Sequence, residues 1–278
     1  MDSERCVHQS PFTDEYLRQE VDFYGRPAPT NRGGLTIRYI RPQRRCDDYL
    51  NVNFHLDPGF DVPALYHSNT LWMSLTWMEV QSLWVPIAMA HGRAATVGLG
   101  LGYFALRVLD QVEHLTVYEK DERVIRWFVD TFADRIGDKI TFVHGDAREL
   151  LQNQEFDYLF VDPYGTLCPD EVITDMRLFW GANDIGVYRF WGQELVVWYA
   201  LGFGLMTPIN LTREERRLFA HWQQSEDSKL RSPHLDYEFV DSVVEALSEV
   251  DSGLSRELQD LAGGHDLRRE QDDCDAVG

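Results

Sequence analysis

Three glycines at alternating positions, Gly98, Gly100 and Gly102, follow the short apolar segment 94–97. An apolar run that ends in such a turn is typical of a strand whose backbone approaches a ligand closely, because no side chain intervenes. The spacing is one residue shorter than the dinucleotide fingerprint, since position 103 is Tyr where that fingerprint has Gly or Ala. The turn therefore predicts a nucleotide-like ligand and favours S-adenosylmethionine (SAM) over NAD.

Acidic residues follow the next two predicted strands in the same way. Glu119 ends the apolar segment 115–118, at the distance from the first glycine where an acid can accept hydrogen bonds from both ribose hydroxyls. Asp146 follows the segment 140–143 and could accept from the adenine amino group, with the backbone of Ala147 against the ring. The predicted cofactor-binding residues are Gly98, Gly100, Gly102, Glu119, Asp146 and Ala147.

The sequence Asp162-Pro163-Tyr164 ends the fourth predicted strand, 158–161. A carboxylate and an aromatic ring at the carboxyl end of a strand are candidates to contact the group that accepts the methyl from the cofactor. We therefore predict Asp162 and Tyr164 as the catalytic residues.

All of these residues require a particular arrangement of elements. Between residues 94 and 182 the apolar patterns alternate between strand and helix, which is typical of a parallel sheet with helices on both faces. In such a sheet ligands bind beyond the carboxyl ends of the strands. The predicted fold is α/β, a Rossmann-like mostly parallel sheet with helices on both faces, plus a small N-terminal β-containing extension.

Other segments are predicted to flank this sheet. Residues 1–34 are polar and turn-rich, which indicates an irregular arm. The segments Leu35–Ile40 and 49–56 alternate well enough to form a β-hairpin. Residues 71–75 resemble another strand, and 195–199 is the best candidate for the fifth strand of the sheet. We expect an arm and β-hairpin extension over 1–70, a SAM-binding domain over 71–247 and an acidic, flexible tail over 248–278.

A helix is expected to begin at Trp77. Thr76 and Glu79 have the spacing of a capping box, in which the threonine accepts from the backbone and the glutamate reaches back. Pro86 should kink or end that helix. The aromatic residues within 179–191 are expected to pack in the core, with the lining of an acceptor pocket as the alternative.

These motifs resemble the class I SAM-dependent methyltransferases, and within them the spermidine synthase-like branch. The resemblance covers about residues 70–165 and rests on the segments 76–86, 117–121, 145–151 and 156–165. It implies that the three glycines surround the methionine end of the cofactor, that Glu119 binds the ribose, that Asp146 binds the adenine, and that Asp162 faces the acceptor.

The sequence also departs from that branch. Its aminopropyltransferases carry a second aspartate three positions after the first, where this chain has Gly165. Aminopropyl transfer from decarboxylated SAM would therefore need another carboxylate, such as Glu79 or Asp175. Asp162-Pro163-Tyr164 is instead similar to the motif of amino-group methyltransferases. The favoured function is methyl transfer to an amine nitrogen of a small molecule or protein; the alternatives are aminopropyl transfer and a non-catalytic SAM-binding or interaction module.

The composition limits the partners. The formal net charge of −20 at pH 7 opposes binding to nucleic-acid phosphates and to anionic membranes, so neither is expected as a partner. The four cysteines lie far apart and predict no metal site. With no apolar leader after Met1, we expect a soluble cytoplasmic protein, and a homo-oligomer is compatible with the sequence.

Overall fold

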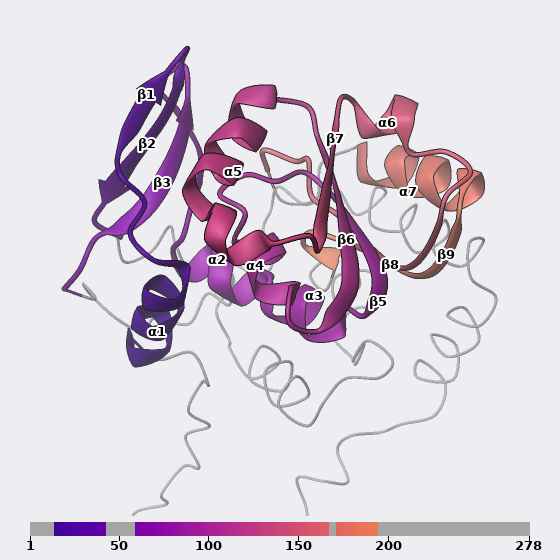
Figure 1. The fold of residues 1–278 in the computed structure, drawn as a ribbon, viewed down its shortest axis with the longest axis horizontal. Helices are drawn as coiled ribbons and strands as arrows, with labels where there is room; N and C mark the ends of the chain where they lie inside the picture. Colours follow the sequence, from indigo (N-terminus) through magenta and orange to yellow (C-terminus); the bar gives the residue numbers. More distant parts are fainter. Residues whose placement is uncertain (1–13, 43–58, 167–170, 194–278) are drawn as a thin grey trace, which may run out of the picture.

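The computed structural model describes residues 14–42, 59–166 and 171–193, which form two sheets (Figure 1). One is a four-stranded antiparallel sheet in the order β1-β2-β3-β4, and the other is a five-stranded parallel sheet in the order β7-β6-β5-β8-β9. The parallel sheet and its helices are β5 (Gly92–Val97), α4 (Tyr103–Val108), β6 (Val112–Glu119), α5 (Glu122–Ile136), β7 (Ile140–His144), α6 (Ala147–Leu150), β8 (Glu155–Val161), α7 (Glu171–Ala182) and β9 (Asp184–Phe190).

Helices cover both faces of the parallel sheet, because alternate residues of its strands point in opposite directions. On β8, Tyr158 and Phe160 join the buried cluster that contains residues of α4 and α5. Leu159 and Val161 join a second cluster with residues of α6 and α7. Strands buried on both faces explain the short continuous apolar runs in the sequence. The predicted Rossmann-like fold class is confirmed.

The antiparallel sheet contains the first strand of the predicted hairpin. It consists of β1 (Thr30–Arg32), β2 (Leu35–Ile40), β3 (Val62–His67) and β4 (Thr70–Ser74). The strand at Leu35–Ile40 is confirmed as β2, which pairs with β1 and β3, and its predicted partner was the segment 49–56. That segment lies outside the described residues. The strand expected at 71–75 is β4, the fourth strand of this sheet.

The N-terminal arm, which the sequence predicts to be irregular, contains a helix. Residues Asp14–Tyr24 form helix α1, whose Leu17, Val21 and Tyr24 recur at helical spacing and are fully buried. The Tyr24 hydroxyl donates to the carbonyl oxygen of Leu101 at 2.7 Å, and the Tyr103 hydroxyl donates to Glu20 at 2.8 Å. Helix α1 therefore supports the glycine turn and the start of α4 through these two hydrogen bonds.

Replacing Tyr24 by phenylalanine should lower the free energy of unfolding by about 1–3 kcal/mol, because the buried Leu101 carbonyl loses its donor. Tyr39→Phe is the matched control, since the Tyr39 hydroxyl donates to the Pro27 carbonyl at 2.9 Å in a partly exposed place. Denaturant unfolding of both variants checks the difference. An equal loss in the two would contradict a specific contribution of α1 to the turn.

The helix expected at Trp77 does begin there, but it is short and its capping box is absent. Helix α2 (Trp77–Ser82) is followed after Leu83 by α3 (Trp84–Met89). Thr76 precedes α2 with no side-chain hydrogen bond to the helix. Pro86 lies in the first turn of α3. Within a continuous helix its ring would collide with the carbonyl group four residues earlier, that of Ser82, and α2 ends at this residue.

The fifth strand of the described parallel sheet is β9, which the sequence reasoning missed. The candidate for that strand, 195–199, lies outside the described residues, as do the other elements expected after residue 193. In β9 the residues Ile185, Tyr188 and Phe190 are buried, so part of the aromatic stretch packs in the core as expected. Trp191, just beyond the strand, has a different position, described below.

Candidate functional site

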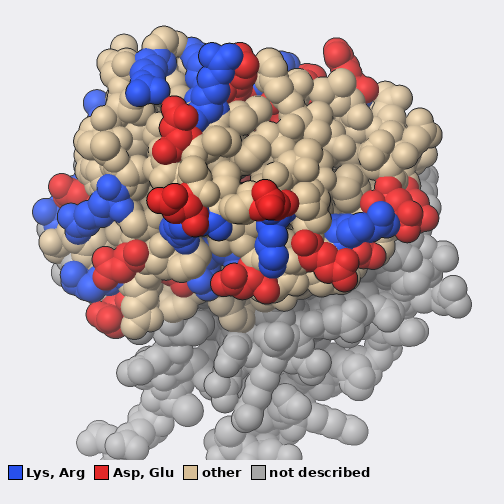
Figure 2. Space-filling view, viewed as in Figure 1, with Lys and Arg blue, Asp and Glu red and all other residues tan. Residues whose placement is uncertain are grey.

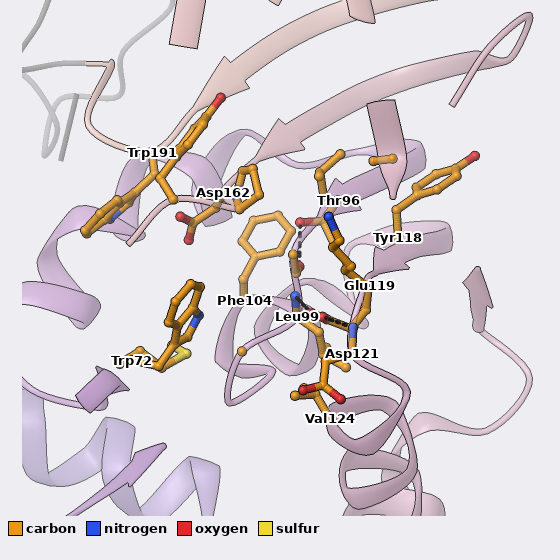
Figure 3. Close-up of a pocket in the computed structure, with 18 of the residues that line it drawn as sticks. Trp72, Thr96, Leu99, Phe104, Tyr118, Glu119, Asp121, Val124, Asp162 and Trp191 are labelled. Carbon is orange, nitrogen blue, oxygen red and sulfur yellow. Dashed lines mark hydrogen bonds between the residues drawn. The ribbon is translucent and has the colours of Figure 1, made fainter. Parts of the chain in front are cut away.

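The carboxyl ends of β5, β6, β7 and β8 surround one cavity of about 620 Å³. Gly98, Gly100, Glu119, Asp146, Ala147, Asp162 and Tyr164 all line it, so seven of the eight predicted site residues come together. Figure 3 shows Glu119 and Asp121 at one end and Asp162, Trp72 and Trp191 at the other, with Leu99 and Phe104 between them. The cavity thus has two ends with different chemistry.

Gly102 is the predicted site residue that does not line the cavity. Its φ is +76°, and a Cβ there would collide with the ring of Phe128. Gly102 therefore allows α5 to pack closely beneath the turn. Gly98 has a φ of +92°, and a Cβ there would collide with the carbonyl oxygen of Asp162. Only glycine fits at position 98, because the ends of β5 and β8 meet there.

Glu119 fixes the glycine turn from the end of β6. One carboxylate oxygen accepts from the backbone N–H of Leu99 at 2.9 Å, and the other accepts from that of Asp121 at 2.7 Å. Burial raises the pKa of the carboxyl group, and these two hydrogen bonds oppose the rise. Each carboxylate oxygen has further acceptor capacity, which remains for a ligand hydroxyl in the cavity.

Asp146 lies at the end of β7, where it caps α6 by accepting from the backbone N–H of Arg148 at 3.0 Å. Its other oxygen accepts from Lys120 Nζ at 2.9 Å. The hydrogen bond from Lys120 holds the pKa of Asp146 below its usual range. The carboxylate therefore stays ionised beside the backbone of Ala147.

Asp162 has the opposite environment at the other end of the cavity. Its carboxyl group points into the space between the indole rings of Trp72 and Trp191, near Phe104 (Figure 3). Burial, with the nearby charge of Glu79 as the second cause, raises the pKa of Asp162 well above its usual range. This is the kind of shift that groups acting on protons show.

Tyr164 is held by a buried network. Its hydroxyl donates to Asp175 at 3.1 Å, and Asp175 also accepts two hydrogen bonds from Arg148, at 2.6 and 2.7 Å. Burial raises the pKa of Tyr164 well above its ordinary value, so the phenol is neutral. Its hydroxyl is occupied by Asp175, so only its ring, which forms part of the cavity wall, is available to a ligand.

Sequence reasoning missed the contribution of the N-terminal part to this site. Trp72 and Met73 of β4 line the cavity, and Met73 contacts the glycine turn through its sulfur, 2.9 Å from the backbone nitrogen of Leu101. Trp191 lines it from the end of β9. Strand patterns predicted β4, but no local pattern indicates that one strand will lie over a turn of another sheet.

Glu79 is the most informative of the missed residues. Instead of capping α2 it lines the cavity, and the residue is only 7% exposed. Burial raises its pKa to about 8. From the sequence alone, Glu79 is only one of two possible second carboxylates for aminopropyl transfer.

The lysine and the two arginines that line the cavity all form ion pairs. Lys120 binds Asp146, Arg123 binds Asp121, and Arg148 binds Asp175. Within the described ranges, neither Glu79 nor Asp162 forms an ion pair with a lysine or arginine. No three His, Cys, Asp or Glu side chains gather as metal ligands in that part of the chain.

The described surface is mixed in charge. On the face in Figure 2 the lysines and arginines are interspersed with aspartates and glutamates. Examples of such exposed pairs are Arg126 with Glu122 and Arg93 with Glu155. No helix among the described residues is long and apolar enough to cross a bilayer.

Neither a protein-family model nor a curated protein matches the sequence. Solved structures with a similar fold include the precorrin-8w decarboxylase of Methanobacterium thermoautotrophicum, with 24% identity and a TM-score of 0.33, over 39% of this chain and 59% of that one. A spermidine synthase in complex with the analogue AdoDATO has 14% identity and a TM-score of 0.37, over 56% and 52%. The glycopeptide N-methyltransferase MtfA has 19% identity and a TM-score of 0.29, over 37% and 48%. This chain thus spans less than two thirds of the length of each of these proteins.

Proposed function

We propose that the cavity binds SAM and that the protein transfers its methyl group to an amine nitrogen. The observation that carries the proposal is the convergence of Glu119, Asp146 and Asp162 from three strand ends on one cavity beside the glycine turn. A cavity of about 620 Å³ is within the range of small-molecule and cofactor sites.

The residues at the cofactor end have distinct roles in this proposal. Glu119 would accept hydrogen bonds from the ribose hydroxyls, and Asp146 from the adenine amino group. The backbone at Gly98 and Gly100 would face the methionine part. When bound, the cofactor supplies a methyl group on a positively charged sulfur.

The residues at the acceptor end position the nucleophile. Asp162 would accept a hydrogen bond from the acceptor amine and so hold its lone pair in line with the bond to be broken. Trp72, Trp191 and Phe104 would form the aromatic walls of this space. Since in-line displacement needs little besides alignment, such positioning can supply much of the rate acceleration. A small molecule or an exposed protein amine fits this proposal better than a nucleic acid, given the net charge of −20.

Aminopropyl transfer from decarboxylated SAM is the second candidate. The observation that favours it is the presence of Glu79 in the same cavity as Asp162, which supplies a carboxylate where position 165 has none. A non-catalytic binding module is the third possibility.

Titration calorimetry with SAM, decarboxylated SAM and methylthioadenosine tests the proposal. We expect SAM to bind more tightly than the other two, and S-adenosylhomocysteine to be released when alkylamines are added. Preference for the decarboxylated form would favour aminopropyl transfer. Binding of SAM without release of product from any amine would favour the non-catalytic module, and binding of none of the three would refute both enzyme functions.

A further inference from the structure

We infer that Glu79 is a second acceptor-binding carboxylate and that, together with Asp162, it makes the site selective for a cationic alkylammonium acceptor. The inference rests on the proposed function, because it assigns the acceptor end of the same cavity. It also selects Glu79, whose spacing from Thr76 predicts a helix cap, over Asp175, the other carboxylate that the sequence offers for this role.

The position of Glu79 is the first support. The residue lies on α2, is 7% exposed, and lines the cavity together with Asp162. After burial, the charge of Glu79 is the second cause that raises the pKa of Asp162. Thr76 accepts no capping bond, so α2 begins without the usual cap while Glu79 faces the cavity.

The second support is the absence of a compensating charge in the described part of the chain. Glu79 is buried and Asp162 is half-buried, and such carboxylates normally require a cation or strong donors, because burial penalises the charged form. The basic residues of the lining are engaged with Asp146, Asp121 and Asp175. A positively charged nitrogen from outside would compensate these carboxylates. For transfer, the bound ammonium group would pass one proton to Asp162, which frees the nitrogen lone pair to attack the methyl group.

The ring system around Asp162 is the third support. Trp72 and Trp191 flank its carboxyl group in Figure 3. The face of an indole ring attracts a cation, and the attraction grows when water is excluded. A substrate with a charged nitrogen and an alkyl chain would therefore find both an anionic and an aromatic partner.

The structure also decides between the two carboxylates that the sequence left open. Asp175 is 1% exposed and is bound by Arg148 and Tyr164, so its charge is already compensated. Gly165, at the position of the second aspartate in aminopropyltransferases, has no side chain. Of Glu79 and Asp175, only Glu79 lines the cavity, and it forms no ion pair with another described residue.

Calorimetric titration of the cofactor-free protein with n-hexylammonium and with 1-hexanol tests the inference. At pH 9 the ammonium group is still charged, because alkylamines titrate near pH 10.4. We expect the ammonium compound to bind at least about tenfold more tightly than the alcohol. Glu79→Gln should remove most of that preference. Glu113→Gln, which removes one exposed negative charge on β6, is the control and should change the affinity less than about twofold.

Proton release provides a second readout that a merely structural role would not affect. Asp162 at the end of β8 and Tyr24 on α1 are the described groups whose pKa values the charge of Glu79 helps to raise, and burial is the main cause of both increases. Glu79 itself has a pKa of about 8. At pH 7.5, binding of the cation should therefore ionise a carboxyl group and release a proton, measurable by calorimetry in two buffers of different ionisation enthalpy. The alcohol should release none.

The outcomes separate this inference from the proposed function. If SAM binds but the wild type shows neither preference for the ammonium compound nor proton release, the inference is overturned and the function stands. Equal affinity of wild type and Glu79→Gln for n-hexylammonium, with both folded by circular dichroism, also overturns it. If SAM does not bind but ammonium selectivity depends on Glu79, the proposed function fails while the cation site is supported. Should Glu79→Gln not fold, the wild-type comparison of ammonium with alcohol remains decisive.

Discussion

Asp162→Asn is expected to reduce methyl transfer by a factor on the order of 10² to 10⁴ while SAM affinity stays within about twofold. Asparagine keeps the size of the side chain but cannot take a negative charge, so it neither attracts an acceptor N–H as strongly nor accepts its proton. The proposed cofactor contacts are Glu119, which lies at the other end of the cavity in Figure 3, and Asp146 at the end of β7. Release of S-adenosylhomocysteine with the best alkylamine acceptor measures the rate, and calorimetry measures the affinity.

The control for Asp162→Asn is Glu155→Gln. Glu155 lies on the same strand at its amino end, is exposed, and forms an ion pair with Arg93 at 3.0 Å. Its replacement should leave transfer nearly unchanged, because exposed ion pairs contribute little. Transfer at the wild-type rate in Asp162→Asn would show that the acceptor binds elsewhere.

Glu119→Ala is expected to weaken SAM binding by about 100-fold, equivalent to roughly 2.7 kcal/mol. Two effects act together. The ribose loses charge-assisted hydrogen bonds, and the backbone N–H groups of Leu99 and Asp121 lose the acceptors that hold them at 2.9 and 2.7 Å. Calorimetric titration with SAM gives the change in affinity, and thermal unfolding shows how much of it comes from a loosened turn.

Glu122→Gln is the matched control for Glu119→Ala. Glu122 is three residues further along, also lines the cavity, and pairs with Arg126 in solvent. Its replacement removes the same charge but no backbone acceptor of the turn, so SAM affinity should change less than about threefold. If both variants bind SAM as the wild type does, Glu119 has no part in cofactor binding.

The parallel sheet could be predicted from the sequence because its central strands are buried on both faces. Short continuous apolar runs mark β5, β6 and β8, and each of these runs ends directly before a glycine or an acid. The run in the edge strand β7 is followed by His144 and Gly145 before Asp146 is reached. Once parallel strands are assumed, their carboxyl ends must lie at one edge. That argument is enough to bring Glu119, Asp146 and Asp162 to one site.

The rest of the site depends on contacts between distant segments, which local patterns do not encode. Residues 71–75 could be predicted as a strand, yet nothing in them indicates that Trp72 and Met73 reach the parallel sheet. Glu79 shows a second kind of failure. Its spacing from Thr76 predicted the start of the helix correctly, but the tertiary environment turned its side chain toward the cavity instead of the helix end.

The parallel pairing of β5 with β8 has a consequence for how the molecule folds. Ala94 lies beside Tyr158 in this pairing, and β6 and β7 intervene in the chain, so a long loop must close before the two strands meet. Such non-local pairing slows folding compared with local contacts. The glycine turn and Glu119 can be joined as soon as β5 meets β6, whereas Asp162 reaches its position only when the later strand docks. During synthesis the proposed cofactor end of the cavity can therefore form before the proposed acceptor end.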